Sequence, residues 1–492
     1  MNLAALTATS PESVGIDSEK LELLFARAKR DVDEGVLPSC QIAVARHGLI
    51  AGMRTYGNAI QGGQQRPATE HTLYHYFSAT KAIVGAAMWL LCEDGVLRLD
   101  EQVAAIIPEF GTHGKDIIDV ETLMLHAGGF PLAPFKQDWW NDRARLLNAF
   151  SEWRLNWPVD SRFEYHATSA HWVMSEIIER RGGMPWKQFI QTRLLAPMGL
   201  DELYIGCPPE QQQRIADVLY VGEHPEPPGG WGEVTPQLIT NFNQAHVRAS
   251  GVPGGGAIAS AASMALFYQP LLNGGVTHDG KQVLKQSTIE LGTQVRAKPQ
   301  HIMEDLKLID PSLVVNTNRA LAVVVAGGDG HAVYRGFGRT CSARTFGHGG
   351  AGGQIAWGDP DTGISVSYAT NGFAPPLLEG RRGVAFSSLA GNCRAYVHAV
   401  VQRRLAALTS RKWGIRIPTA PPHTAGSRTC MENADVYFRK ASLGFGPVHQ
   451  PTYYSRCGTR DTRHIAAQTW HKRVRGWRRT AACGVRRRQR LR

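Results

Sequence analysis

Two hairpin patterns lie near opposite ends of the first 400 residues, and they constrain the fold more than any other feature of the chain. Residues 40–57 (CQIAVARHGLIAGMRTYG) predict two strands joined at His47-Gly48, and residues 354–372 predict two more around a glycine-containing turn. Between these hairpins, from about residue 100 to residue 300, the pattern is mostly helical. We therefore predict an α+β fold in which distant segments form one sheet and a helical lobe is inserted between them.

This layout gives the predicted domain boundaries. Residues 1–408 form the folded domain, with a sheet lobe at about 11–100 and 300–408 and a helical lobe at about 101–299. The chain carries 54 Lys and Arg against 42 Asp and Glu, a net charge of +12. From residue 411 onward, however, 19 basic residues face three acidic ones. The excess positive charge thus belongs to the end of the chain.

We interpret residues 409–492 as a basic, solvated and disordered tail, because they are rich in Arg and have little apolar periodicity. Binding to nucleic acid or to an acidic surface, or a non-native terminus, are the alternatives that the sequence leaves open. Nucleic acid is not an expected partner of the domain itself, whose charge is mildly acidic.

The sequence predicts a cytoplasmic protein. No apolar run approaches the roughly 20 residues that span a bilayer. The first 20 residues have neither a basic region nor an apolar stretch typical of a signal peptide. The eight cysteines are scattered without a C-x-x-C pair, which is typical of free, reduced thiols. The oligomeric state stays open.

Ser78 and Lys81 stand at the start of an apolar segment, in the stretch YHYFSATKAIVGAAMWLL. Residues three apart on a helix share a face, so the amine can take the serine proton if burial lowers the pKa of the lysine. The apolar residues that follow would supply this burial. Taken alone, the pair also fits a helix cap followed by a lysine that extends into water.

Tyr165 is predicted in a loop just before a helix capped by Thr168 or Ser169. A phenol in this position can project into a cleft and move a proton. The alternative is a tyrosine that only packs its ring at the lobe boundary.

The segment TFGHGGAGGQIAW places five glycines around His348 and Ala351, immediately before a strand. Small residues allow a ligand to approach the backbone, and N–H groups at the strand edge can hold an oxyanion. A simple glycine-rich turn is the alternative interpretation.

Together and in this order, these motifs resemble those of the serine β-lactamase and penicillin-binding-protein superfamily. Ser-Ala-Thr-Lys at residues 78–81 matches the family's S-x-x-K, Tyr-His-Ala at 165–167 stands where Y-x-N is expected, and His-Gly-Gly at 348–350 replaces K-T-G. The chain looks like the class C and family VIII carboxylesterase branch, and the similarity runs from about residue 11 to residue 392. The resemblance implies an antiparallel sheet flanked by helices, an all-helical lobe, and an active site at their junction.

By this resemblance, Ser78 is the acylated nucleophile, and Lys81 and Tyr165 handle its proton. The backbone N–H groups of Ser78 and Ala351 would form the oxyanion hole. No metal and no cofactor are implied.

Two departures from the family pattern concern the substrate. Ala167 cannot make the amide hydrogen bonds of the family's Asn, and His348 lacks the fixed positive charge of the family's Lys. His348, Gly349 and Gly350 are still expected to contact the substrate, with His348 able to bond Tyr165 or the substrate. These departures favour a carboxylesterase of short-chain esters. A β-lactamase or D-alanyl-D-alanine carboxypeptidase, or a non-catalytic scaffold with this fold, are the alternatives.

Trp139 and Trp157 belong to a tryptophan-rich stretch that could line an apolar acyl pocket; packing in the core is the alternative. His71 and His75 are spaced like a helical metal pair. Their segment reads as a strand, and no carboxylate or cysteine partner lies at ligand spacing, so we expect no metal there. The expected partner is a small ester or amide substrate.

Overall fold

The computed structural model describes residues 3–224, 226, 235–307 and 310–395. The predicted domain boundary at residue 408 and the basic tail after it lie outside the described residues.

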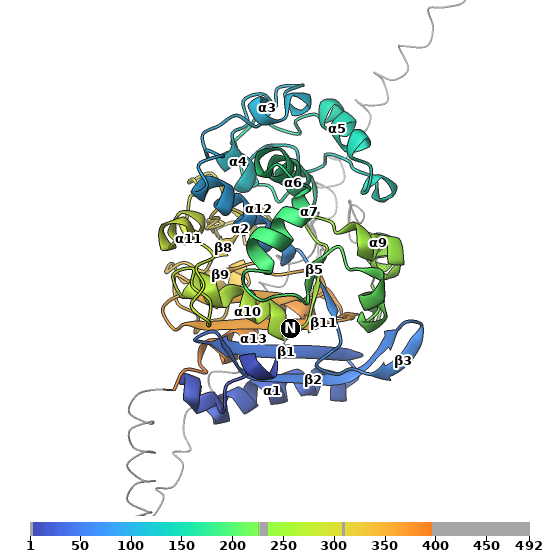
Figure 1. Ribbon diagram of the computed structural model, residues 1–492, viewed down its shortest axis with the longest axis vertical. Coiled ribbons are helices and arrows are strands. Elements are labelled where there is room, and N and C mark those ends of the chain that lie inside the picture. Colours follow the sequence, from blue (N-terminus) through green and yellow to red (C-terminus); the bar gives the residue numbers. More distant parts are fainter. Residues whose placement is uncertain (1–2, 225, 227–234, 308–309, 396–492) are drawn as a thin grey trace, which may run out of the picture. The chain divides into compact units, whose positions relative to one another are not determined.

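A seven-stranded antiparallel sheet joins the two ends of the domain, as the two hairpins predicted (Figure 1). The central strands pair an early segment with a late one, aligning Cys40 with Thr370 and Arg46 with Ile364. In spatial order the strands are β3 (Gln64–Pro67), β2 (Leu49–Gln61), β1 (Ser39–Arg46), β11 (Ile364–Thr370), β10 (Ile355–Asp359), β9 (Phe346–Gly347) and β8 (Val324–Val325).

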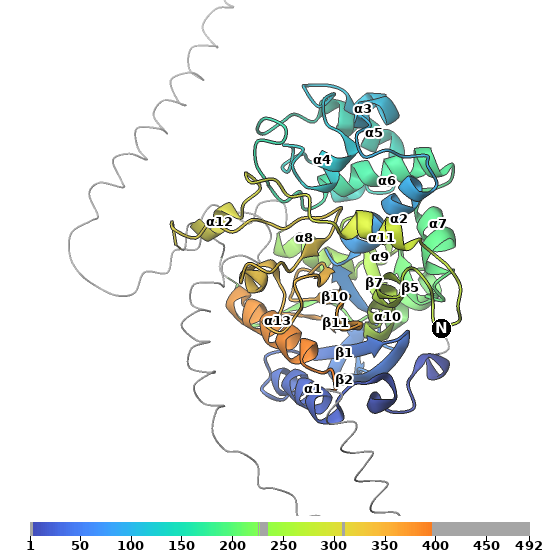
Figure 2. The ribbon, with the colours of Figure 1, turned by 90° about the vertical axis from the view of Figure 1, so that its left-hand side faces the viewer.

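Helices cover both faces of this sheet (Figure 2). The spacing of the apolar residues over 18–35 predicts an amphipathic helix, and this segment forms α1 (Ser18–Asp33), whose Leu21, Leu24 and Phe25 are buried. It packs with α13 (Pro376–Gly391) on one face, where the two helices and the sheet enclose one hydrophobic core. On the other face, α10 (Ala261–Leu272) contacts the sheet and contributes to the larger core.

The position of α10 differs from the lobe boundaries expected from the sequence. Its residues fall inside the predicted helical lobe, 101–299, yet the helix packs directly on the sheet. Residues 261–271 are all buried, because the helix lies between the sheet and the rest of the larger core. Because such a helix is apolar on all sides, its sequence has no polar face that would indicate which side packs on the sheet.

The helical lobe lies at one end of the sheet in Figure 1 and is built mostly from short helices. Its elements, with those at the junction, are α2 (Thr80–Glu93), α3 (Val103–Ile106), α4 (Val120–Met124), α5 (Arg143–Glu152), α6 (Ser169–Gly182), α7 (Trp186–Phe189), α8 (Pro236–Thr240), α9 (Ala245–Ser250), α11 (Gln286–Thr293) and α12 (Glu304–Lys307). A three-stranded antiparallel sheet, β4 (Tyr74–Phe77), β7 (Ala257–Ala259) and β5 (Leu203–Ile205), also lies at the junction, and β6 (Leu219–Tyr220) pairs in parallel with β12 (Gly372–Phe373).

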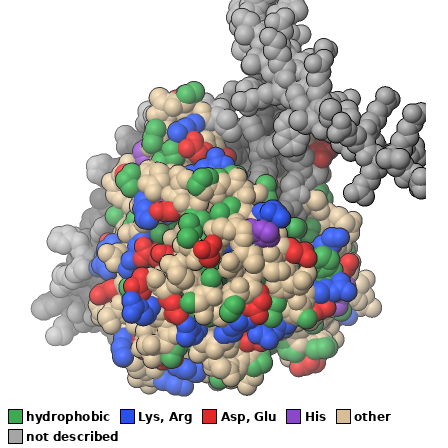
Figure 3. Space-filling model, turned by 90° about the horizontal axis from the view of Figure 1, so that it is seen from above, with side chains coloured by type: hydrophobic (Ala, Val, Ile, Leu, Met, Phe, Trp, Pro, Cys, Tyr) green, Lys and Arg blue, Asp and Glu red, His purple; other side chains and the backbone are tan. Residues whose placement is uncertain are grey.

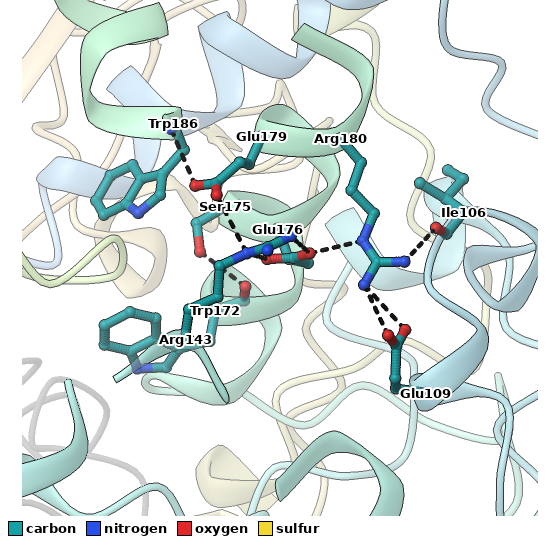
Figure 4. A network of polar contacts seen from close by, with 9 residues as sticks. All are labelled: Ile106, Glu109, Arg143, Trp172, Ser175, Glu176, Glu179, Arg180 and Trp186. Carbon is teal, nitrogen blue, oxygen red and sulfur yellow. Dashed lines mark hydrogen bonds and ion pairs between the residues drawn. The ribbon is translucent and has the colours of Figure 1, made fainter. Parts of the chain in front are cut away.

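A buried carboxylate ties three of these helical segments together (Figure 4). Glu176 of α6 is 2 % exposed and accepts hydrogen bonds from Arg143 of α5 and from Arg180 of its own helix. Arg180 reaches on to the carboxylate of Glu109 and the carbonyl of Ile106. Since a buried charge is stable only when it is paired and hydrogen-bonded, this network fixes α6 relative to its neighbours.

The surface at the helical end carries acidic and basic side chains side by side (Figure 3). This mixture agrees with the near balance of 35 basic and 39 acidic residues over positions 1–410. Among the described residues, no helix is both long and apolar enough to cross a membrane.

Candidate active site

Ser78 lies in the short connection between β4 and α2. The preceding residue, Phe77, has a φ of 43°, in the left-handed region that residues with a side chain rarely adopt. The connection places Ser78 on the wall of a cavity. The N-cap of α2 is Ala79, which makes no side-chain cap hydrogen bond, so the alternative of a helix-capping serine does not hold.

Lys81 lies in the first turn of α2 and is fully buried, which excludes a lysine that extends into water. Its Nζ is 3.1 Å from Ser78 Oγ, 2.8 Å from the carbonyl oxygen of Ala167 and 2.7 Å from that of Gly254. A neutral amine has two N–H groups and one lone pair. The two carbonyls can only accept, so they take both N–H groups and leave the lone pair directed at the Ser78 hydroxyl.

Burial is the largest influence on this amine and lowers the pKa of Lys81 below the ordinary 10.5. Tyr165 opposes the shift, while the positive charge of Arg319 adds to it. A lysine with a lowered pKa beside a serine hydroxyl is suited to act as a general base. The third residue of the Tyr-His-Ala motif takes part through its backbone, because the carbonyl of Ala167 holds the amine.

Tyr165 lines the same cavity as Ser78, and the buried Lys81 amine lies next to Ser78 without being part of the cavity wall. Two basic groups lie near the Tyr165 ring. Lys81 Nζ is 5.0 Å from the ring centroid, and the guanidinium carbon of Arg319 is 5.4 Å from the same centroid. The phenolic oxygen is buried and has no hydrogen-bond partner at ordinary distance among the described residues, although it is close enough to the Lys81 amine to raise the pKa of that group. A buried hydroxyl without a partner at a reaction centre is available to a substrate or a water molecule.

His348 has both ring nitrogens engaged. Nδ1 is 2.7 Å from the carbonyl oxygen of Gly349, which can only accept, so Nδ1 carries the proton. Nε2 then accepts from Arg319 at 3.1 Å. Burial, with the nearby charges of Arg319 and Lys81, holds the pKa of His348 well below 6.5, so the ring is neutral. The expected hydrogen bond to Tyr165 is not formed in this arrangement; the two ring centroids are 5.9 Å apart.

Arg319 is the functional residue that the sequence did not indicate. It precedes β8, is 8 % exposed and lines the cavity, and among the described residues no carboxylate forms an ion pair with it. Burial lowers the pKa of Arg319 to about 10, so it stays charged at neutral pH. The site therefore retains a positive charge close to His348, supplied by a residue that belongs to no motif.

Ser78 and Ala351 are the two residues whose backbone N–H groups were expected to form the oxyanion hole. Ser78 and Ala351 both line it, and neither N–H donates to another described residue. Ala351 lies in a tight turn closed by hydrogen bonds between Gly350 and Gln354, of 2.9 and 3.1 Å. A pair of unengaged N–H groups beside a nucleophile is the arrangement of an oxyanion hole.

The cavity has a volume of about 280 Å³, and apolar side chains form its wall on the side of the helical lobe. These side chains are Phe77, Trp140, Leu238, Ile239, Phe242 and Val252. Trp139 and Trp157, which we expected at a substrate pocket, are not part of this wall. Trp139 packs on Phe135, and Trp157 is covered by the Arg162 guanidinium at 3.7 Å. Trp140, the residue directly after the short helix at residues 137–139, lines the cavity instead.

Three buried histidines lie behind Tyr165. The ring of His126 is 5.0 Å from Tyr165 and 5.7 Å from each of His166 and His171. Burial lowers the pKa of all three, so they are neutral and add no charge to the site. These histidines are not arranged as metal ligands, because among the described residues no group of three or more His, Cys, Asp or Glu side chains could hold a metal ion. His75, from the histidine pair noted in the sequence, is buried in β4.

A family model described as Beta-lactamase matches residues 24–388. Among curated proteins, the esterase/beta-lactamase LipL of Mycobacterium tuberculosis is 25 % identical over 325 residues, which cover 61 % of this chain and 70 % of LipL. The family-model match, residues 24–388, spans all three motifs described above.

Two solved structures share the fold. A penicillin-binding protein homologue from Caulobacter crescentus superposes with a TM-score of 0.61 at 24 % identity, covering 76 % of this chain and 98 % of its own. A family VIII carboxylesterase superposes with a TM-score of 0.60 at 21 % identity, covering 76 % of this chain and 98 % of its own. These likenesses confirm the predicted α+β fold with an antiparallel sheet and flanking helices.

Proposed function

The chain belongs to the beta-lactamase family and is a serine hydrolase of that superfamily, and from this premise we propose that it is a carboxylesterase of short-chain esters. The observation that carries the proposal is the contact of 3.1 Å between Lys81 Nζ and Ser78 Oγ, made by a buried amine. The names of an esterase relative and of a carboxylesterase with the same fold support it.

In the proposed reaction, Ser78 Oγ attacks the ester carbonyl carbon while its proton passes to Lys81 Nζ. The negative charge that develops on the carbonyl oxygen is held by the N–H groups of Ser78 and Ala351. When the tetrahedral intermediate collapses, the carbon–oxygen bond to the alcohol breaks, and the departing alkoxide takes the proton from Lys81. Tyr165, whose hydroxyl is unengaged, assists this transfer.

Water completes the cycle in the second half of the reaction. Lys81, neutral again, removes a proton from a water molecule that attacks the acyl carbon on Ser78. A second tetrahedral oxyanion forms in the same pair of N–H groups; when it collapses, the bond from the acyl carbon to Ser78 Oγ breaks, the acid is released, and Oγ takes back the proton from Lys81. One base and one oxyanion site thus serve both halves.

The volume and the apolar wall of the cavity suit an ester with a small acyl group. Its volume of about 280 Å³ suits a chain of a few carbons, and Trp140 and Phe242 offer it an apolar wall. The side chain of Ala167 provides no amide donor for a peptide-like substrate.

Replacing the nucleophile tests the proposal. Ser78→Ala should abolish hydrolysis of p-nitrophenyl butyrate, whereas Ser287→Ala, at an exposed serine of α11, should leave it unchanged. Ester hydrolysis that persists in Ser78→Ala would refute the proposed function.

Arg319 favours a second candidate, a β-lactamase or D-alanyl-D-alanine carboxypeptidase. An unpaired guanidinium at the cavity wall can bind the carboxylate that such substrates carry. The sequence favoured neutral esters partly because the neutral His348 stands where the family has a charged lysine. The Arg319 guanidinium supplies a positive charge in the place of that lysine. If a chromogenic cephalosporin is turned over faster than p-nitrophenyl butyrate, and Arg319→Met selectively slows the cephalosporin, the second candidate replaces the first.

A further inference from the structure

The turn that carries Ala351 needs an exact backbone path, because its N–H group must point into the cavity. Gly352 and Gly353 follow with φ angles of 77° and 81°, values that side-chain-bearing residues rarely adopt. Such a turn has many accessible conformations in isolation, so contacts from the surrounding structure must select one.

On the inner side, the turn is held by the sheet and by β4. The Gln354 side chain donates to the carbonyl of Thr370 and accepts from its N–H, both at 2.9 Å. A Cβ at Gly350 would lie 2.2 Å from the carbonyl oxygen of Tyr76, so the turn packs tightly on the strand that leads to Ser78. These contacts fix residues 350 and 354, at the two ends of the turn.

The middle of the turn is held from the outer side by Arg382 of α13. Its Nη2 donates to the carbonyl of Gly352 at 3.0 Å, and a Cβ at Gly353 would lie 2.6 Å from the same nitrogen. Arg382 is 1 % exposed, and its Nε and Nη1 have no hydrogen-bond partner among the described residues.

A buried guanidinium with a single hydrogen bond is a costly feature of a fold. Tyr368, whose ring centroid lies 5.8 Å from the guanidinium carbon, provides only a weak aromatic contact. An apolar side chain would fill this space at lower cost, so stability alone does not account for an arginine here. The guanidinium interacts electrostatically with the carboxyl of Glu379, one helical turn earlier on α13, but its one hydrogen bond among the described residues is to the turn next to Ala351.

We propose that Arg382 is a positioning residue for the reaction: by holding the Gly352 carbonyl, it fixes the peptide planes of the turn and so directs the Ala351 N–H at the developing oxyanion. This inference rests on the proposed function. It predicts a contribution to the tetrahedral states of both half-reactions and none to the binding of the planar ester.

The test compares Arg382→Met with Arg27→Met in the full chain. Arg27 is the control because its guanidinium lies 5.2 Å from the ring of Phe386, also on α13, while its hydrogen bond goes to Asp31 on its own helix and not to the turn. For each variant, kcat and KM for p-nitrophenyl butyrate, the inhibition constant of phenylboronic acid and the melting temperature are measured. Phenylboronic acid forms a tetrahedral adduct with an active serine and so reports on the oxyanion hole.

Arg382→Met should lower kcat about tenfold or more, with KM changed less than about threefold, and should weaken phenylboronic acid by a similar factor as kcat. Arg27→Met should leave all three constants unchanged. A folded Arg382→Met with wild-type kcat, or with reduced kcat and unchanged boronate inhibition, would overturn the inference.

If Arg382→Met gives no folded protein, Arg382→Lys takes its place under the same criteria. The lysine keeps the positive charge but carries it on a single donating nitrogen with a different shape. We therefore expect kcat to fall severalfold and phenylboronic acid to inhibit more weakly by a similar factor. Unchanged values in a folded Arg382→Lys would count against the positioning role. Ser78→Ala, measured alongside, distinguishes failure of the proposed function from failure of this inference. If Ser78→Ala still hydrolyses the ester, the proposed function is wrong. If Ser78→Ala is inactive and the Arg382 variant is normal, only the role of Arg382 is wrong.

Discussion

Arg319 offers an unusual prediction, because its replacement should stabilise the protein while impairing the site. The guanidinium is 8 % exposed, has no ion-pair partner among the described residues, and donates to His348. Arg319→Met keeps a long, flexible, apolar side chain in the same space and removes the charge. The expected change in the free energy of unfolding can be worked out from these contacts.

Burial lowers the pKa of Arg319 from 12.5 to about 10, which corresponds to about 3 kcal/mol at roughly 1.4 kcal/mol per pH unit. The unfolded chain binds this proton more tightly than the folded protein, so the full penalty is present at any pH below about 10. Against this gain, the variant loses one hydrogen bond, about 1 kcal/mol, and the contacts with the Tyr165 and Phe163 rings, about 0.5 kcal/mol each. The balance is a stabilisation of about 1 kcal/mol.

Urea unfolding at pH 7.5 measures this balance, with Arg335→Met as the matched control. Arg335 is also buried, but it donates to both carboxylate oxygens of Asp329, at 2.7 and 2.5 Å. Since the Asp329 side chain is 43 % exposed and water can solvate it after the change, the loss should be about 2 kcal/mol. A destabilisation of Arg319→Met as large as that of Arg335→Met would refute the reasoning, since it would mean that the Arg319 charge is compensated in the folded protein.

Three further predictions concern the base, the network of α6 and the cavity wall. Because the neutral amine of Lys81 is the base, kcat/KM for p-nitrophenyl butyrate should rise with pH as Lys81 loses its proton, and the midpoint of this rise should lie below 10.5. A profile that is flat from pH 6 to pH 9 would contradict this role. Glu176→Leu should destabilise the protein by about 1–2 kcal/mol in urea unfolding, since it removes the buried carboxylate that Arg143 and Arg180 share and leaves them only Glu179 and Glu109 as partners, whereas a neutral effect would show that the network adds nothing. Trp140→Ala should enlarge the cavity and shift the preferred p-nitrophenyl ester from butyrate toward longer acyl chains; an unchanged chain-length profile would place the acyl group elsewhere.

The sequence predicted those parts of the fold in which local periodicity reflects burial. The first helix has one buried face, and Leu21, Leu24 and Phe25 lie on it as predicted. Both hairpins and the strand before Ser78 also formed as expected. The lobe containing α10 was harder to assign, because a helix that is buried on all sides carries no pattern that distinguishes its neighbours.

The site divides in the same way between residues with a motif and residues without one. Ser78, Lys81 and Tyr165 could be found because their spacing and order resemble a family, and in the structure the buried Lys81 amine lies close to both Ser78 and the Tyr165 ring. Arg319 and Arg382 could not be found, since each reaches the site by tertiary packing from a segment with no distinctive local pattern. Trp140 and Trp139 are adjacent in sequence, so only the local backbone decides which of them lines the cavity.

The most direct test of the central claim is to map where an active-site-directed fluorophosphonate attaches. The folded protein is treated with the reagent, digested and analysed by mass spectrometry, with Lys81→Met treated in parallel. The account predicts a single adduct on Ser78 and labelling of the lysine variant that is slower by about a hundredfold or more. A folded protein that is not labelled, or one labelled at another residue, would contradict it.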